Sequence, residues 1–267
     1  MAIGSMSFVT ARCWNKMGLD FAGLVKRMFL PGAIYTFVGA GGKSTAIRLV
    51  AGILSRAGAR ARMTTTTKIG IEEFSNYPIS FVKTEDDLQI AVSGREPVGL
   101  IVGSAFHDRG KYGGVDPSLF ERLSVDSDTI LLVEGDGSRR RPLKAPDDWE
   151  PVIPRATAMV VAMMGASGFG EPIDEDHCYN HEAALRILPA GARCFAASEV
   201  ATLASHPAGC RKGVLPGMRY HVLMNQADLG DKRPIGSEAL RILTFTHGIQ
   251  GSLLSFQQEV VYETDIG

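Results

Sequence analysis

A glycine-rich run near the start of the chain has the composition of a phosphate-binding loop. Glycines allow consecutive backbone N–H groups to turn inward around phosphate oxygens, and a following helix adds partial positive charge at its N-terminus. We expect Lys43 to reach the terminal phosphates, the Ser44 hydroxyl to bind Mg²⁺, and Thr45 to support the loop from the first helical turn. The predicted loop comprises Gly39, Ala40, Gly41, Gly42, Lys43, Ser44 and Thr45.

The spacing of this run departs from the commonest phosphate loop. The pattern G-x-x-x-x-G-K-S would place its first glycine at position 37, which here is Phe37, so the loop is the shorter G-x-x-G-K-S-T from Gly39. This spacing resembles the loops of Mur-type ligases and folylpolyglutamate synthetases, and it therefore admits ligase-like chemistry. The alternative is a glycine turn that serves only the tight packing of a strand against a helix.

Two carboxylates follow an unbroken apolar run. The segment TILLVEGDGS resembles a Walker-B strand, in which a buried strand delivers an acid to its exposed end near the nucleotide. Alternation along an extended chain would aim Glu134 and Asp136 toward one side, so that one holds Mg²⁺ while the other positions a nucleophile. The sequence leaves open which does which, and a polar turn around Gly135 and Gly137 is the structural alternative.

Cations adjoin two of the predicted strand ends. Lys68 follows four threonines whose hydroxyls could hold metal-bound water, while Arg139 and Lys144 belong to the basic segment after Asp136. We expect these three cations to contact a phosphate or an anionic substrate. Threonines are also ordinary strand formers and charged loops are commonly solvated, so structural roles stay open.

A further strand end carries a motif that could recognise a base. The residues Asn225-Gln226-Ala227-Asp228 resemble the guanine motif N-K-x-D, with glutamine in the lysine position. The Asp228 carboxylate can accept hydrogen bonds from guanine N1–H and from its 2-amino group, which adenine cannot supply, while Asn225 braces neighbouring loops. Because the lysine is missing, both GTP and ATP remain open, and the alternative is a strand-terminating turn.

These motifs lie where apolar runs alternate with helical stretches, a pattern typical of a parallel sheet covered by helices. We predict an α/β fold with a doubly wound, mainly parallel sheet, P-loop NTPase-like with three Rossmann-like layers, in which ligands bind beyond the carboxyl ends of strands. The predicted strands are Ala33–Val38, Ala61–Thr65, Ile79–Val82, Val98–Val102, Thr129–Val133, Ala158–Met163, Arg193–Ala196, Tyr220–Met224 and Ser252–Phe256. The predicted helices are Ser44–Arg56, Asp86–Val92, Pro117–Leu123, His181–Ile187, Val200–Ser205 and Ser237–Thr246.

Length and composition suit one such domain. We predict that residues 31–267 form the nucleotide-binding α/β domain and that residues 1–30 form a helical N-terminal extension. The formal net charge of -1 gives no global attraction to nucleic acid or to an anionic membrane, and no apolar run approaches the roughly 20 residues of a membrane helix. The four cysteines form no C-x-x-C pair, which favours a reducing cytoplasm.

A ligand-rich stretch, PIDEDHCYNHEAAL, places His177 and His181 on one face if it is helical. The pattern H-x-x-x-H without a defined third ligand is a weak metal signal. Structural or substrate-contact roles are therefore favoured, and we assign no metal ligand in this stretch.

Taken together, several motifs resemble the YqeC family of selenium cofactor biosynthesis proteins over about Ala33 to Asp228: VGAGGKST, TTTTK, KYGGVDP, VEGDGSRRRPLKAPDDWEPVIP and MNQAD. The resemblance implies an accessory protein for maturation of selenium-dependent molybdenum hydroxylases, with a molybdenum hydroxylase or its maturation proteins as partners. The positions that carry the family's motifs are Gly39, Gly42, Lys43, Ser44, Glu134, Asp136, Lys144, Asn225 and Asp228.

Three functions remain open from the sequence. The first is a Mg²⁺-dependent nucleoside triphosphatase that couples hydrolysis of GTP or ATP to cofactor assembly. The second is an ATP-dependent ligase or small-molecule kinase whose acceptor lies against the basic segment from Arg139 to Lys144. The third is a non-catalytic, nucleotide-dependent chaperone or sensor. The expected catalytic residues are Lys43, Glu134 and Asp136, and the expected metal ligands are Ser44, Glu134 and Asp136.

Overall fold

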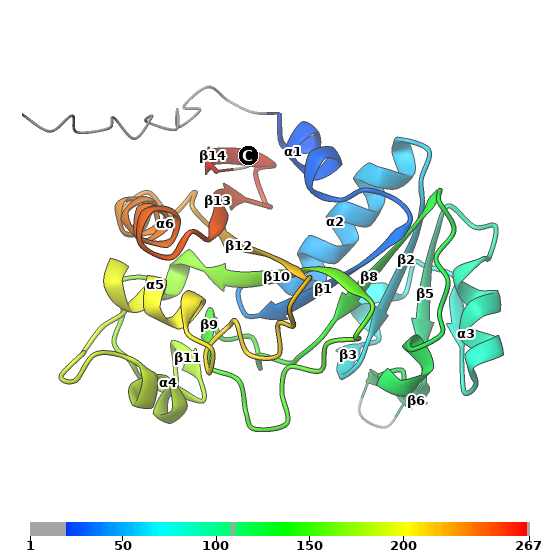
Figure 1. The fold of residues 1–267 in the computed structure, drawn as a ribbon, viewed down its shortest axis with the longest axis horizontal. Coiled ribbons are helices and arrows are strands. Elements are labelled where there is room, and N and C mark those ends of the chain that lie inside the picture. Colours follow the sequence, from blue (N-terminus) through cyan, green and yellow to red (C-terminus); the bar gives the residue numbers. More distant parts are fainter. Residues whose placement is uncertain (1–19, 108–109, 266–267) are drawn as a thin grey trace, which may run out of the picture.

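The computed structural model describes residues 20–107 and 110–265, and it contains a nine-stranded, mainly parallel sheet (Figure 1). The strand order is β14-β13-β12-β10-β1-β8-β2-β5-β4, and only β13 and β14 pair antiparallel. These strands are β1 (Ala33–Gly39), β2 (Arg60–Thr65), β4 (Ile79–Phe81), β5 (Val98–Val102), β8 (Thr129–Glu134), β10 (Thr157–Gly165), β12 (Arg219–Asn225), β13 (Gln250–Ser255) and β14 (Val260–Thr264). The helices are α1 (Phe21–Met28), α2 (Lys43–Arg56), α3 (Glu85–Val92), α4 (His181–Ile187), α5 (Ala197–Ser205) and α6 (Arg233–His247).

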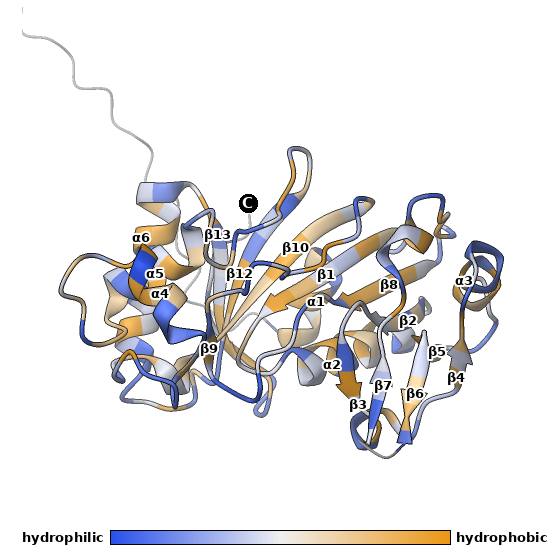
Figure 2. Cartoon of the chain, turned by 90° about the horizontal axis from the view of Figure 1, so that it is seen from below, coloured by the Kyte–Doolittle hydropathy of each residue, from blue (hydrophilic) through white to orange (hydrophobic). Residues whose placement is uncertain are grey.

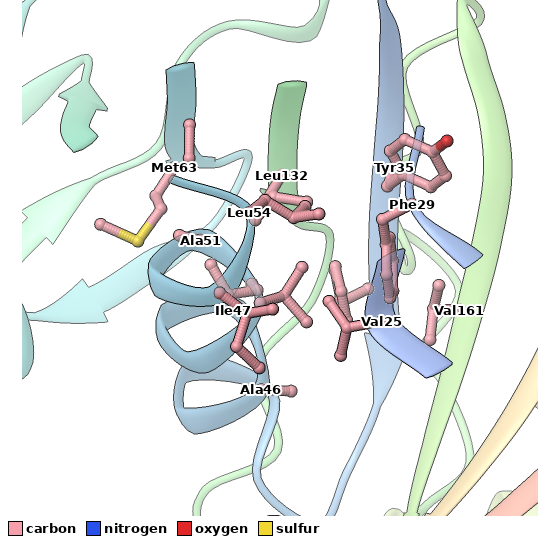
Figure 3. Close-up of a cluster of buried hydrophobic side chains, with 14 of the residues drawn as sticks. Val25, Phe29, Tyr35, Ala46, Ile47, Ala51, Leu54, Met63, Leu132 and Val161 are labelled. Atoms are coloured by element: carbon pink, nitrogen blue, oxygen red, sulfur yellow. The ribbon is translucent and has the colours of Figure 1, made fainter. Parts of the chain in front are cut away.

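Helices cover both faces of this sheet, as predicted for a three-layer fold. Tyr35 and Phe37 of β1 belong to the core cluster that includes α1 and α2, whereas Ile34 and Val38 belong to the clusters on the opposite face, with α3 and with α4 to α6. Figure 3 shows the first cluster, in which the apolar side of α2 packs against the sheet. Successive residues of one strand therefore serve different layers, because side chains alternate across a strand.

The centre of the sheet is apolar on both faces. All six residues of β8 are buried, and most of β10 is buried as well. Figure 2 shows β1 and β10 as mainly hydrophobic strands. This burial explains why the corresponding segments lack polar alternation, as expected for central parallel strands.

Two predicted elements were wrong or shorter than predicted. The segment Arg193–Ala196 is no strand; only Cys194 forms an isolated bridge, to Pro172. The predicted helix Pro117–Leu123 is a 3-10 helix over Pro117–Phe120, whose N-terminus is capped by the Asp116 side chain. In both cases a short apolar or capped segment carries the local signal without the length that a regular element needs.

Several very short strands were not predicted. A three-stranded antiparallel sheet contains β3 (Lys68–Gly70), β7 (Lys111–Gly113) and β6 (Ser104–Phe106), in that order. A parallel pair joins β9 (Leu143–Lys144) to β11 (Cys178–Tyr179). Strands of two or three residues are too short to show a period, yet both small sheets border the carboxyl end of the main sheet, where ligands bind in such folds.

The N-terminal helix is part of the main core. Phe21, Leu24, Val25 and Met28 of α1 are buried in the same cluster as α2, and the Phe21 ring lies 5.7 Å from that of Phe256. Residues 1–19 of the predicted extension lie outside the described residues. Within the described ranges, no helix combines the length and apolar character needed to cross a membrane.

Candidate functional site

The glycine-rich loop joins β1 to α2, where the sequence predicts a phosphate site. Gly39, Gly41 and Gly42 have φ angles of 89°, 87° and 109°, in the region that favours glycine. A Cβ at Gly41 would lie 2.2 Å from the backbone nitrogen of Gly165, and one at Gly39 would lie 2.5 Å from the Met163 oxygen. The neighbouring strand β10 therefore permits only glycine at these two positions.

Lys43 begins α2 and is only 4% exposed. Its ammonium group donates to the Gly39 carbonyl at 2.5 Å and lies 3.2 Å from Asp136 Oδ1. Burial lowers the pKa of Lys43, but the Asp136 and Glu134 carboxylates outweigh this effect, so its pKa is raised and the side chain is cationic. The positive charge of Lys43 therefore lies beside the glycine-rich loop.

Glu134 ends β8 next to the first turn of α2. The Ser44 hydroxyl donates to Glu134 Oε2 at 3.0 Å, which brings together two predicted metal ligands. Burial raises the pKa of Glu134 to about 7, against the opposing influence of Lys43 and of the Ser44 hydrogen bond. Glu134 also lines the large cleft over the loop.

Asp136 lies beneath the loop and not in the cleft. It is 1% exposed, and both of its carboxylate oxygens accept from the Gly39 amide, at 3.1 and 3.0 Å. The same carboxylate contacts the ammonium groups of Lys43 and Lys144, at 3.2 and 3.3 Å. The sequence predicts that Glu134 and Asp136 point toward one side, but the two carboxylates have different surroundings. Strand β8 ends at Glu134, so the alternation of a strand does not continue to Asp136.

Lys144 completes a group that we call the buried ion network: Lys43, Asp136, Lys144 and Glu150. The Lys144 side chain is fully buried, contacts the Glu150 carboxylate and the Gly137 carbonyl, and lies 4.9 Å from the centre of the Tyr179 ring. It therefore does not line the cleft, in contrast to the expectation of direct contact with a bound substrate. Glu150 was missed from the sequence, since no spacing rule links it to Lys144.

The cleft has a volume of about 870 Å³. The glycine-rich loop from Gly41 to Thr45 forms one wall, and segments from β3, from β7 and from the turn after β8 form others. Lys68 and Arg139, two of the predicted substrate contacts, line it. The structure therefore brings the glycine-rich loop, Glu134 and several basic residues to one space at the carboxyl end of the sheet.

The four threonines before Lys68 are mainly structural. Hydroxyl groups of Thr64, Thr65 and Thr66 donate to carbonyl oxygens of Ile101, Glu134 and Val152, at 2.9, 3.0 and 2.9 Å. Thr67 alone of the four lines the cleft. The run fixes the end of β2 against its neighbours, and only its last residue is available to a ligand.

Asn225 braces the glycine-rich loop, which is the contact that the motif predicts. Its side-chain nitrogen donates to the Gly41 carbonyl at 2.9 Å, and its side-chain oxygen accepts from the Phe256 amide at 2.9 Å. The next residue, Gln226, has a φ of 68° and accepts from the Ser167 hydroxyl at 2.8 Å. Ser167 and Gln226 both line the cleft, a pairing that sequence patterns did not indicate.

Asp228 follows on the same loop and is half-buried. Within residues 20–107 and 110–265, its carboxylate has no hydrogen bond or ion pair. The base-reading role of Asp228 stays a prediction.

The histidine stretch does not assemble a metal site in the described part of the chain. His177 instead pairs with Asp174, with 2.7 Å between Nδ1 and Oδ1, while His181 begins α4. This pairing gives His177 a partner within its own segment.

Comparison with known proteins gives the family. A model of the YqeC protein family matches residues 35–182, which include the glycine-rich loop and the acidic end of β8. The uncharacterized protein YqeC of Escherichia coli strain K12 is 31% identical over 229 residues, which cover 85% of this chain and 88% of that protein. The resemblance predicted from the motifs is confirmed, and the chain belongs to the YqeC family.

Proposed function

We propose that this protein binds a nucleoside triphosphate with Mg²⁺ in the cleft and hydrolyses it, as an accessory protein in maturation of selenium-dependent molybdenum hydroxylases. The observation that carries the nucleotide part is the contact between the Ser44 hydroxyl and the Glu134 carboxylate beside Lys43, at the mouth of the glycine-rich loop. Membership of the YqeC family supports the maturation part.

The residues present fit a magnesium ion. Ser44 and Glu134 offer a hydroxyl and a carboxylate, the hard oxygen ligands that Mg²⁺ prefers. When bound, the ion would neutralise charge on the terminal phosphates. We assign its direct contacts to Ser44 and Glu134 and give Asp136 a positioning role, because Asp136 is committed to Gly39 and two lysines.

Lys43, Asp136 and Glu134 have different roles in the proposed hydrolysis. Lys43 exchanges its contact with the Gly39 carbonyl for the terminal phosphates, which stabilises the charge that develops during phosphoryl transfer. Asp136 keeps its contact with Lys144 during this exchange, so no buried carboxylate is left unpaired. One carboxylate oxygen of Glu134 would contact Mg²⁺, and the other would accept a hydrogen bond from the attacking water and orient it toward the terminal phosphorus.

Guanine is the base that the Asn225 loop suits best. Asn225 ties this loop to Gly41, and Gln226 already lines the cleft two residues before Asp228. The free Asp228 carboxylate can accept from N1–H and the 2-amino group of guanine. Asp228→Asn should move preference from GTP toward xanthosine triphosphate, because an amide can accept from xanthine N1–H and donate to its 2-oxo group. Competition binding with GTP, ATP and xanthosine triphosphate measures this; an unchanged order would place the base elsewhere.

The central test compares binding with turnover. Lys43→Ala should abolish GTP and ATP binding in calorimetry with Mg²⁺, whereas Glu134→Gln should retain binding and lose phosphate release. Thermal unfolding of each variant checks that it folds, and Arg95→Ala, outside the cleft, controls for loss of one cation. Unchanged nucleotide binding by Lys43→Ala would refute the site.

The maturation role needs a cellular readout. A strain that lacks this gene should lose the activity of its selenium-dependent molybdenum hydroxylase, and the wild-type gene should restore it. The Lys43→Ala gene should fail to restore it although the protein accumulates. Full hydroxylase activity in the deleted strain would refute the role while leaving nucleotide binding untouched.

A further inference from the structure

The turn after β8 has an unusual sequence for its shape. The Arg141 amide donates to the Ser138 carbonyl at 2.9 Å, and the two intervening residues, Arg139 and Arg140, have φ angles of 47° and 63°. A hydrogen-bonded turn with positive φ at both central residues is type I′, which strongly favours Asn-Gly. Two arginines in this conformation are strained, and strained backbone that persists is concentrated at functional sites.

Both arginines lie on the wall of the cleft. The Arg139 guanidinium is 5.3 Å from the centre of the Tyr179 ring, which leaves its N–H edge available, and Arg140 has no hydrogen bond or ion pair within the described residues. In the part of the chain that the structure describes, the strained turn therefore presents two guanidinium groups without a hydrogen-bond acceptor or an ion-pair partner. Guanidinium groups match phosphate and carboxylate oxygens in a bidentate geometry.

A second basic wall of the cleft belongs to the three-stranded sheet of β3, β7 and β6. Lys68 pairs with Gly113 and Lys111 pairs with Gly70 across β3 and β7, so the two lysines are diagonal neighbours on one face. Both line the same cleft as the arginines. Neither wall is part of the glycine-rich loop.

The charges that line the cleft exceed what the phosphate loop needs. Lys43 is paired with Asp136, and Arg48 donates to the backbone carbonyls of Ser44 and Glu73. The lining cations are Lys43, Arg48, Lys68, Lys111, Arg139, Arg140 and Arg141, and the lining acids are Glu72, Glu73 and Glu134. A surplus of cations in a concave, partly enclosed space attracts an anion in addition to the nucleotide.

We propose that the Arg139–Arg140 turn, with Lys68 and Lys111, is a second anion subsite that holds an acidic small-molecule co-substrate beside the terminal phosphate of the nucleotide. The co-substrate carries a phosphate group or two carboxylates. Its role as a co-substrate rests on the nucleotide function proposed above, whereas the anion subsite itself does not.

The decisive variant replaces the turn with the sequence that its shape prefers, Arg139→Asn with Arg140→Gly. Because Asn-Gly suits a type I′ turn, the melting temperature should be equal to or above that of the wild type, so lost binding cannot result from unfolding. The charge-matched control is Arg95→Ala with Arg122→Ala, which removes two cations that do not line the cleft.

Calorimetry at low ionic strength, with inorganic phosphate and with malonate as probes, measures the subsite. The wild type, saturated with Mg²⁺ and a non-hydrolysable GTP analogue, should bind at least one probe saturably. The Asn-Gly variant should bind it at least tenfold more weakly, while the control variant should bind it as the wild type does. The stronger probe identifies the anionic group of the co-substrate.

The same titration in a Lys43→Ala chain separates the two proposals. Anion binding should persist there without nucleotide and should fall when the Asn-Gly turn is added. If neither probe binds in either background, or if the Asn-Gly variant binds as tightly as its parent, the subsite is refuted. Anion binding at the turn without any nucleotide binding by the wild type would instead refute the nucleotide function.

Discussion

The cleft above the glycine-rich loop and the buried ion network beneath it use the same residue types in different surroundings. In the cleft, the Ser44 hydroxyl is the one hydrogen-bond partner of the Glu134 carboxylate among residues 20–107 and 110–265, and burial raises the pKa of Glu134 to about 7. In the network, Asp136 is flanked by Lys43 and Lys144 and holds the Gly39 amide. Glu134 thus faces the cleft, whereas Asp136, separated from it by one glycine, supports the loop from beneath. This difference predicts unequal losses of stability when each carboxylate is neutralised.

Asp136→Ala should give the largest loss of stability. It leaves Lys43 and Lys144 buried without their shared carboxylate, and breaking a buried ion pair costs about 3–5 kcal/mol. Glu134→Gln should cost little stability, because it replaces a carboxyl group whose ionisation is already opposed by burial. Urea unfolding at pH 8 measures both free energies. Equal losses for the two variants would remove the distinction between cleft and network.

Lys144→Met should cost about 3 kcal/mol, since Glu150 loses its cation and Asp136 keeps only Lys43. Adding Glu150→Gln should recover part of this loss, because the second change removes the carboxylate that the first left unpaired. A double-mutant cycle in urea should give a coupling of about 0.5–3 kcal/mol. Additive losses would mean that Glu150 does not belong to the network.

A buried titratable group outside both regions sharpens the contrast. His221 on β12 faces Ser252 at 3.0 Å, and burial lowers the pKa of His221 to about 3, with a further lowering effect from Arg219. Below its usual pKa near 6.5 the unfolded chain takes up a proton that the folded chain does not. Stability is therefore lost as pH falls below about 6.5, by at most about 1.4 kcal/mol per pH unit, or about 2 kcal/mol by pH 5.

His221→Gln should flatten this acid dependence while retaining a polar contact with Ser252. Chemical unfolding at pH 7, 6 and 5 compares the variant with the wild type. A parallel pH dependence in both would show that His221 is not the group responsible. Buried Lys43 differs from His221 because the Asp136 and Glu134 carboxylates outweigh burial and raise the pKa of Lys43.

The sequence predicts the parts of the site that depend on short, local patterns. Gly39 and Gly41 are required by their own backbone angles and by the approach of β10, and the unbroken apolar run within β8 indicated a central strand. Because these requirements depend on consecutive residues, the sequence was sufficient to predict the loop, the class of sheet and the acidic end of β8.

Features that depend on distant contacts were not predictable in the same way. Lys144 was predicted from the sequence as a substrate contact, and nothing local indicated that Asp136, Glu150 and Tyr179 surround it. The strain at Arg139 and Arg140 has no sequence signal, because arginine does not favour a type I′ turn. Such features are set by tertiary packing, which no local period records.

The two hydrogen bonds of Asn225 have a consequence for biosynthesis. One reaches back to Gly41 and the other forward to Phe256, so a single amide joins segments from near the two ends of the chain. A nascent chain emerges from the ribosome N-terminus first, and the complete glycine run is therefore available long before its brace. The loop therefore cannot gain this brace in its final form until the residues through Phe256 have been synthesised.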